Sequence, residues 1–280
     1  MKTRKYLLSF GLVLASVVST YFATTSVAQQ GTQPQTAAAD TEYQIGAILF
    51  MQKAAEYRAL AYQAFNIAEM RLDADEKDRK KLPSAERRKP RAIVVDVDET
   101  VLDNSPAQAV QVKNRLPFIQ EKWTAWVNMR KAKAIPGAID FLNYASRKGA
   151  RVFYVTNRIE VEKQPTIDNL KALGFPDVSD ETVLVKTTES SKEARRQTIL
   201  QRYRIAILIG DNLDDLSNVF ERKAIDARFA EVDKTREMFG RKFIVLPNAM
   251  YGTWEGAIYE YGRLTEAQKT EKRANALEGY

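Results

Sequence analysis

The chain has 280 residues, is 45% hydrophobic and 28% charged, and carries a net charge of +7, which is ordinary for a globular protein with one large domain. It contains no cysteine and no histidine, so disulfides, thiolate or imidazole metal sites, cysteine nucleophiles and Ser-His-Asp triads are excluded. Any catalysis must therefore use carboxylates, lysine, hydroxyls or a metal ion held by oxygen atoms, which select hard cations such as Mg²⁺, Ca²⁺ or Mn²⁺.

Residues 1–28 have the three-part pattern of a secretory signal peptide. Three basic residues precede an apolar stretch from Tyr6 to Phe22, and small residues follow up to Ala28. We expect cleavage after Ala28 and a periplasmic or secreted protein with no stable membrane anchor. An uncleaved anchor is the alternative, although the apolar stretch contains serine and threonine and is short for a membrane span.

The next segments are expected to be a flexible leader at 29–40 and a helical N-terminal annex at 41–89. The leader is rich in Gln, Thr and Ala. In the annex, apolar residues recur at spacings of three and four, which predicts one long helix packed by a single face. Residues 73–90 are highly charged and are expected to be a solvated connector. The basic residues are otherwise dispersed, so we expect no nucleic-acid polymer as a partner. The apolar positions are Phe50, Ala54, Tyr57, Ala61, Phe65, Ala68 and Leu72.

From residue 90 onward, short aliphatic runs alternate with helical segments. The runs are continuously apolar rather than alternating, which indicates parallel strands buried on both faces. We therefore predict an α/β fold, with a doubly wound, Rossmann-type parallel sheet over residues 90–255 and a smaller helical cap or annex. A helical insertion is expected at about 107–135, and a C-terminal tail at 256–280. Strands are predicted at 92–95, 151–155, 183–185, 205–209 and 243–246, and helices at 136–148, 161–173, 190–203 and 213–220.

Polar side chains follow three of these strands at the end where each one stops. Ligands of parallel sheets bind beyond the carboxyl ends of the strands, so these residues are expected to meet. Asp96, Asp98 and Asp211 would repel one another unless a divalent cation lay among them, and Mg²⁺ prefers such oxygen ligands. Thr156 can donate a hydrogen bond to a phosphoryl oxygen, and Lys192 can offset its charge. An acidic solvated loop is the alternative reading of the carboxylate cluster.

The same stretches resemble a known family. "DVDET" at 96–100 with "LDNS" at 102–105, "VTNR" at 155–158, and a lysine ahead of "GDNLDD" at 210–215 resemble the haloacid-dehalogenase (HAD) superfamily. Within it, the chain is similar to the class C acid phosphatases, which are secreted and outer-membrane 5′-nucleotidases. "KAAEYRALAYQAFN" at 53–66 and "PNAMYGTWEGA" at 247–257 add to the likeness, which covers about 43–259.

The resemblance implies a HAD-like core and assigns roles to the site residues. Asp96 would be the nucleophile that becomes an aspartyl phosphate, and Asp98 the general acid and base. Lys186 is a rival to Lys192 as the phosphate-binding lysine, and Asp214 is expected to cap the helix that follows it. The implied site comprises the metal ligands Asp96, Asp98, Asp211 and Asp215, the phosphate-binding residues Thr156, Asn157 and Lys192, and the substrate-binding residues Trp123 and Tyr251.

The function expected is a secreted, Mg²⁺-dependent acid phosphatase that hydrolyses small-molecule phosphomonoesters, above all nucleoside 5′-monophosphates. Trp123 and Tyr251 would hold the planar leaving group, although both are equally well read as buried aromatics of a helical cap. The alternatives are a phosphatase of small non-nucleotide esters, a non-catalytic protein that binds phosphate compounds, and a surface protein that binds anionic polymers. The resemblance also implies a homodimer.

Overall fold

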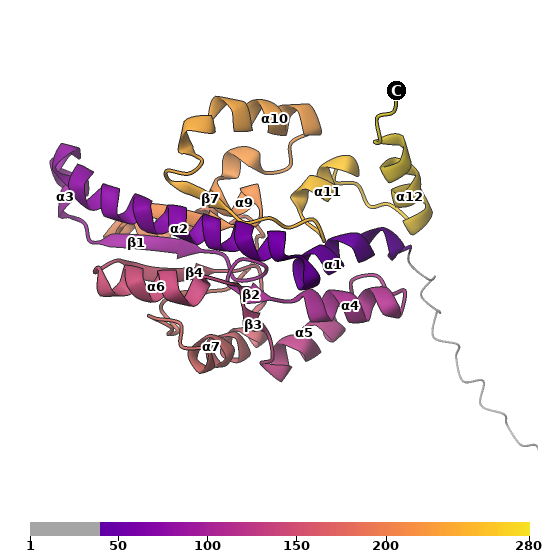
Figure 1. Ribbon diagram of the computed structural model, residues 1–280, viewed down its shortest axis with the longest axis horizontal. Helices are drawn as coiled ribbons and strands as arrows, with labels where there is room; N and C mark the ends of the chain where they lie inside the picture. The colour runs from indigo at the N-terminus through magenta and orange to yellow at the C-terminus, as the bar shows by residue number, and fades with distance from the viewer. Residues whose placement is uncertain (1–39) are drawn as a thin grey trace, which may run out of the picture. The chain divides into compact units, whose positions relative to one another are not determined.

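The central sheet has five parallel strands in the order β5-β4-β1-β6-β7, of which Figure 1 labels β1, β4 and β7. The computed structural model describes residues 40–280, so the predicted signal peptide at 1–28 and all but the last residue of the leader at 29–40 lie outside the described residues. The parallel α/β sheet is confirmed. Its strands are β1 (Arg91–Val95), β4 (Arg151–Val155), β5 (Val183–Leu184), β6 (Arg204–Gly210) and β7 (Phe243–Val245).

The central strand β1 is buried on both faces, as the continuous apolar pattern predicts. Its side chains alternate, so Ile93 and Val95 belong to one hydrophobic cluster and Ala92 and Val94 to the other. The pairing of β1 with β6 contains one bulge, where an extra β6 residue opposes the step from Ala92 to Ile93.

Helices cover both faces of the sheet, which is the doubly wound arrangement. On one face, Phe65 and Leu72 of α2 and Phe141 of α6 share a core with β1 and β6, and Figure 1 shows α2 and α6 side by side. On the other face, Ile199 of α8 and Leu216 of α9 pack on the opposite side chains. These helices are α2 (Ala55–Asp78), α6 (Ala138–Arg147), α8 (Glu193–Arg202) and α9 (Leu213–Leu216). Helix α7 (Lys163–Ala172) also packs on the first face, and α10 (Ile225–Lys234) contacts the short helix η4 (Asn218–Phe220) that follows α9.

The expected N-terminal annex is an integral layer of the core. Its helix is interrupted at Ala54, whose backbone is extended, and then continues to Asp78. The prediction of a solvated connector from residue 73 is therefore wrong for its first turns. The charged end of α2 is held because the carboxylate of Asp75 accepts two hydrogen bonds of 2.7 Å from the guanidinium of Arg204 at the start of β6. The segment comprises η1 (Glu42–Gln44), α1 (Ile45–Lys53), α2, η2 (Arg79–Lys81) and α3 (Ser84–Arg88).

The expected insertion is helical and is framed by a second, two-stranded sheet that the sequence pattern did not reveal. Strands β2 (Leu102–Asp103) and β3 (Lys133–Ala134) pair antiparallel, and α4 (Ser105–Lys113) and α5 (Gln120–Met129) lie between them in the chain. The helix predicted at 213–220 is broken at Ser217, whose backbone is extended. The remaining elements are η3 (Glu160–Glu162), η4 (Asn218–Phe220), η5 (Arg236–Met238), α11 (Thr253–Ile258) and α12 (Glu266–Asn275).

The C-terminal tail is helical as well. Thr265 and Gln268 form a capping box that starts α12. Within residues 40–280, the helices are all too short or too polar to cross a lipid bilayer.

Candidate active site

The candidate site lies where the chain changes direction across the sheet. After β1 the chain builds β4 and β5 on one side, and it then returns to build β6 and β7 on the other. Such a switch leaves a crevice beyond the carboxyl ends of the strands. A cavity of about 520 Å³ lies there, and Asp96 after β1 and Asp211 after β6 both line it.

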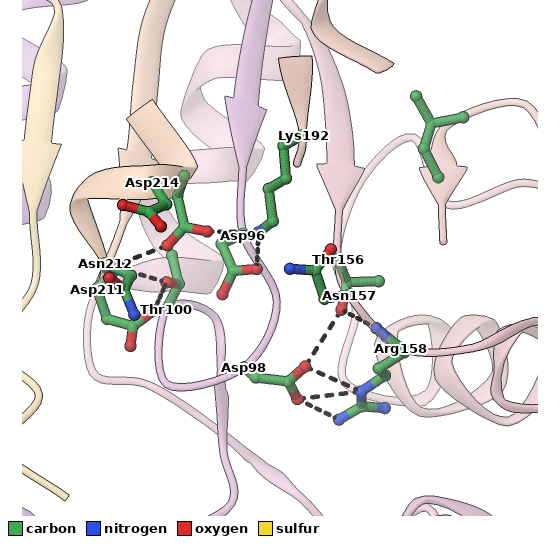
Figure 2. A network of polar contacts seen from close by, with 12 residues as sticks. Asp96, Asp98, Thr100, Thr156, Asn157, Arg158, Lys192, Asp211, Asn212 and Asp214 are labelled. Carbon is green, nitrogen blue, oxygen red and sulfur yellow. Dashed lines mark hydrogen bonds and ion pairs between the residues drawn. The ribbon is translucent and has the colours of Figure 1, made fainter. Parts of the chain in front are cut away.

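Three carboxylates lie close together in this cavity, and two of them contact one lysine (Figure 2). One oxygen each of Asp96, Asp211 and Asp215 lies within 4.8 Å of the others. Lys192 Nζ donates to Asp96 Oδ1 and forms an ion pair of 2.7 Å with Asp215 Oδ1. The structure therefore brings together four of the predicted site residues from three separate segments.

Burial and neighbouring charges shift the pKa values of the residues in this cluster. Burial, reinforced by neighbouring Asp215 and Asp98, raises the pKa of Asp96 to about 7 against the opposing effect of Lys192, and burial likewise raises the pKa of Asp211 well above its usual range. The carboxylates of Asp215 and Asp96 raise the pKa of Lys192 although burial opposes this, so the lysine stays charged.

A divalent cation fits this cluster. When all three carboxylates are ionised, they carry two more negative charges than the ammonium of Lys192 neutralises. The donors are all oxygen atoms, which suit a hard cation such as Mg²⁺. Asp96, Asp211 and Asp215 are the residues that would hold it.

The β6–α9 turn positions Asp215 and Asp211. A side chain on Gly210 would collide with that of Asp215, so only glycine lets the helix start this close to the strand end. Asp215 Oδ2 accepts a hydrogen bond of 3.0 Å from the backbone N–H of Asn212 and so caps α9. The expectation that Asp214 is the cap is wrong. Asp214 instead forms a 3.0 Å ion pair with Arg228 of α10.

A tight turn after Asp96 brings Asp98 to the same cavity. Glu99 has a left-handed backbone with φ of 58°, and its N–H donates to the carbonyl of Leu102 at 2.8 Å. The Glu99 carboxylate accepts from the N–H of Asn104 at 2.8 Å, which fixes the turn from inside. Such strain in a buried loop is typical of functional sites.

Arg158 is the main site residue that the sequence reasoning missed. Its buried guanidinium donates to Asp98 Oδ1 at 2.8 and 3.0 Å (Figure 2). Asn104 Nδ2 donates to the same oxygen at 2.9 Å. The only signal in the sequence was its place directly after Thr156 and Asn157 at the end of β4. These hydrogen bonds from Arg158 and Asn104 therefore fix the position of the Asp98 side chain.

The predicted phosphate-binding residues differ in their burial and in the contacts that they make. Thr156 is fully buried, and its hydroxyl donates to Asp98 Oδ2 at 3.2 Å. Asn157 lines the cavity, where its Oδ1 accepts from Arg195 at 2.7 Å. Of the two rival lysines, Lys186 only lines the cavity, whereas Lys192 contacts the carboxylates.

Aromatic side chains form another part of the cavity wall. Trp123 of α5 and Tyr251 both line it and are only partly buried, so neither is a sealed core residue. Phe118, which the sequence did not single out, lies with its ring centroid 6.4 Å from that of Trp123. The guanidinium of Arg158 lies 5.7 Å from the Trp123 ring centroid and connects this wall to Asp98.

Known proteins share this architecture. A solved class C acid phosphatase from Bacillus anthracis is 39% identical, covers 86% of this chain and 98% of its own, and superposes with a TM-score of 0.80. A second structure of a class C acid phosphatase from the same organism, with tungstate bound, gives 39% identity over the same shares and a TM-score of 0.79.

Two plant proteins match over a shorter region. A stem 31 kDa glycoprotein from Glycine max and acid phosphatase 1 from Solanum lycopersicum are each 29% identical over 129 and 130 residues, which is 44% of this chain. The match spans about half (51%) of the length of these curated relatives.

One family pattern covers most of the chain. Residues 9–254 match the HAD superfamily, subfamily IIIB (acid phosphatase). This range includes the strand ends that supply the cluster around Lys192. The chain therefore belongs to subfamily IIIB of the HAD superfamily, the acid phosphatase subfamily.

Proposed function

We propose that the protein is a phosphoric monoester hydrolase that works through a phosphoryl-aspartate intermediate on Asp96. The observation that carries this proposal is the position of Asp96. It lies at the carboxyl end of the central strand, lines the cavity, and is in contact with a buried, charged lysine. Family membership supports the same reading, since the relatives named above include acid phosphatases.

In the first half-reaction, a carboxylate oxygen of Asp96 attacks the phosphorus atom and forms an O–P bond. The bond from phosphorus to the ester oxygen breaks, and Asp98 gives a proton to that leaving oxygen. Lys192 offsets the charge of the phosphoryl oxygens. Arg158 holds Asp98 in place through its two hydrogen bonds to Oδ1.

In the second half-reaction, water attacks the same phosphorus atom and Asp98 takes its proton. The bond between phosphorus and Asp96 breaks, which returns the carboxylate and releases inorganic phosphate. Over the two steps, one ester and one water become one alcohol and one phosphate. Mg²⁺ bound by Asp96, Asp211 and Asp215 would supply charge neutralisation for the phosphate dianion.

We expect Asp96→Asn to lower phosphate release by at least about 10³-fold, because an amide cannot form the acyl phosphate. Initial rates with a phosphomonoester and a phosphate assay measure this. The matched control is Asp214→Asn, because Asp214 pairs with Arg228 and does not line the cavity. Retained turnover in Asp96→Asn would remove Asp96 as the nucleophile. No turnover in the unsubstituted protein would instead favour a protein that only binds phosphate compounds.

Removal of divalent metal with EDTA should abolish phosphate release, and added Mg²⁺ should restore it. A second readout is the unfolding temperature, which Mg²⁺ should raise in the unsubstituted protein because ligands stabilise the state that binds them. Asp211→Asn should weaken that rise, since it removes one of three charged ligands. Full activity in EDTA, or an equal thermal shift in Asp211→Asn, would contradict the proposed metal site.

We further propose that nucleoside 5′-monophosphates are the preferred substrates. Trp123 and Tyr251 in the cavity wall support this, because stacking of a base on an aromatic ring contributes roughly 1–3 kcal/mol and tolerates different bases. The runner-up is a phosphatase of small esters without a planar leaving group.

A substrate panel separates the two. Nucleoside 5′-monophosphates should show a higher kcat/KM than glycerol or sugar phosphates, and Trp123→Ala should lower the value for nucleotides by about tenfold. The kcat/KM for glycerol phosphate should stay within about twofold, because that leaving group offers no ring to stack. Equal values across the panel would favour the runner-up.

Export from the cytoplasm is proposed from the N-terminal pattern at residues 1–28. If it is correct, intact mass measurement of the protein recovered from a bacterial periplasm or culture medium should give a chain that begins at Gln29. A recovered chain that still carries residues 1–28 would favour the uncleaved anchor.

A further inference from the structure

One part of the cavity wall is built from the two ends of the described chain. Asp40 and Tyr43 line it from the N-terminal side, Glu255 and Tyr259 from α11 and its end, and Lys269 from α12. The family match ends at residue 254, so α12 and most of α11 lie beyond it. Glu255, Tyr259 and Lys269 therefore lie outside the segment that matches the family, whereas Asp40 and Tyr43 lie inside it.

A single carboxylate oxygen joins the two tyrosines of this wall. The hydroxyls of Tyr43 and Tyr259 each donate a hydrogen bond of 2.6 Å to Glu255 Oε1. The shared acceptor therefore holds two phenol rings from distant parts of the sequence close to each other. The wall is preorganised rather than loosely packed.

Arg273 connects α12 to this pair. Its guanidinium carbon lies 3.8 Å from the ring centroid of Tyr43, and its Nη1 donates to the hydroxyl of Tyr259 at 2.7 Å. Its Nη2 donates to Asp40 Oδ2 at 3.1 Å. The side chain is only 16% exposed although it stands on the last helix of the chain. Figure 1 shows α12 beside the start of the described chain, as these contacts require.

We propose that Arg273 is a specificity-determining positioning residue, which holds Tyr43 and Tyr259 as the wall that contacts the leaving group of the substrate. Arg273 does not line the cavity and so acts through the two tyrosines. The inference rests on the proposed phosphatase activity. A cavity of about 520 Å³ exceeds what a phosphoryl group occupies, so the same cavity has room for a bulky leaving group beside the walls that Tyr43 and Tyr259 line.

The test compares two esters that differ in the leaving group, adenosine 5′-monophosphate and glycerol 2-phosphate. Arg273→Ala should raise KM for the nucleotide about tenfold and leave kcat within about twofold, because binding of the leaving group is lost while the chemistry is kept. Both constants for glycerol 2-phosphate should stay within about twofold. Arg273→Lys should give an intermediate KM, since it keeps the cation and loses the planar donors.

Lys272→Ala is the matched control. Lys272 stands next to Arg273 on α12, but its partner is Glu260 at 2.9 Å and it does not line the cavity. Its constants for both esters should equal those of the unsubstituted protein.

An unchanged nucleotide KM in Arg273→Ala, or an equal loss on both esters, would overturn the inference and leave the phosphatase activity standing. If Arg273→Ala lowers the unfolding temperature, the same comparison on Arg273→Lys decides: a KM rise confined to the nucleotide supports the inference, and no rise contradicts it. Absence of phosphate release from both esters by the unsubstituted protein would refute the proposed activity, and this inference with it.

Discussion

Three carboxylates lie close together beside a single buried lysine, and the surrounding structure stabilises this concentration of charge. Buried charges are stable only when they are paired or neutralised. Lys192 pairs with Asp96 and Asp215, while Thr100 and Asn248 donate hydrogen bonds of 3.1 and 2.8 Å to Asp211. The remaining negative charge makes this position suited to a divalent cation and to a phosphate dianion beside it.

The strands of the sheet and the turns that follow them both position this carboxylate cluster. The strands β1 and β6 are paired along their length and end side by side, which places Asp96 next to Asp211. Gly210 allows Asp215 to approach the strand end, and the strained turn at Glu99 directs Asp98 into the same cavity. The rigid sheet therefore positions the carboxylates, while loops and helices at its edge supply the walls that a leaving group would meet.

The two walls of the cavity differ in origin. Trp123 and Phe118 belong to the insertion framed by β2 and β3, whereas Tyr43 and Tyr259 come from the two ends of the described chain. An arginine guanidinium contacts an aromatic ring in each wall: Arg158 lies near Trp123, and Arg273 lies over Tyr43. The residues proposed to react with the phosphoryl group thus follow strands of the sheet, whereas the residues proposed to contact the leaving group lie on helices and loops outside it.

The sequence alone determined the parallel sheet and the site at the ends of its strands. Continuous aliphatic runs such as 92–95 predicted buried parallel strands, and acids just after them predicted a shared site, because strand ends of one sheet must meet. Only the tertiary structure decided the rest. Arg158 and Asp75 are charged residues whose partners lie far away in sequence, the strands β2 and β3 are too short to show a period, and α12 has a polar pattern that does not reveal what it packs against. The physical reason is the same in each case: local sequence encodes burial and periodicity, but the pairing of distant charges and rings exists only once the chain has folded.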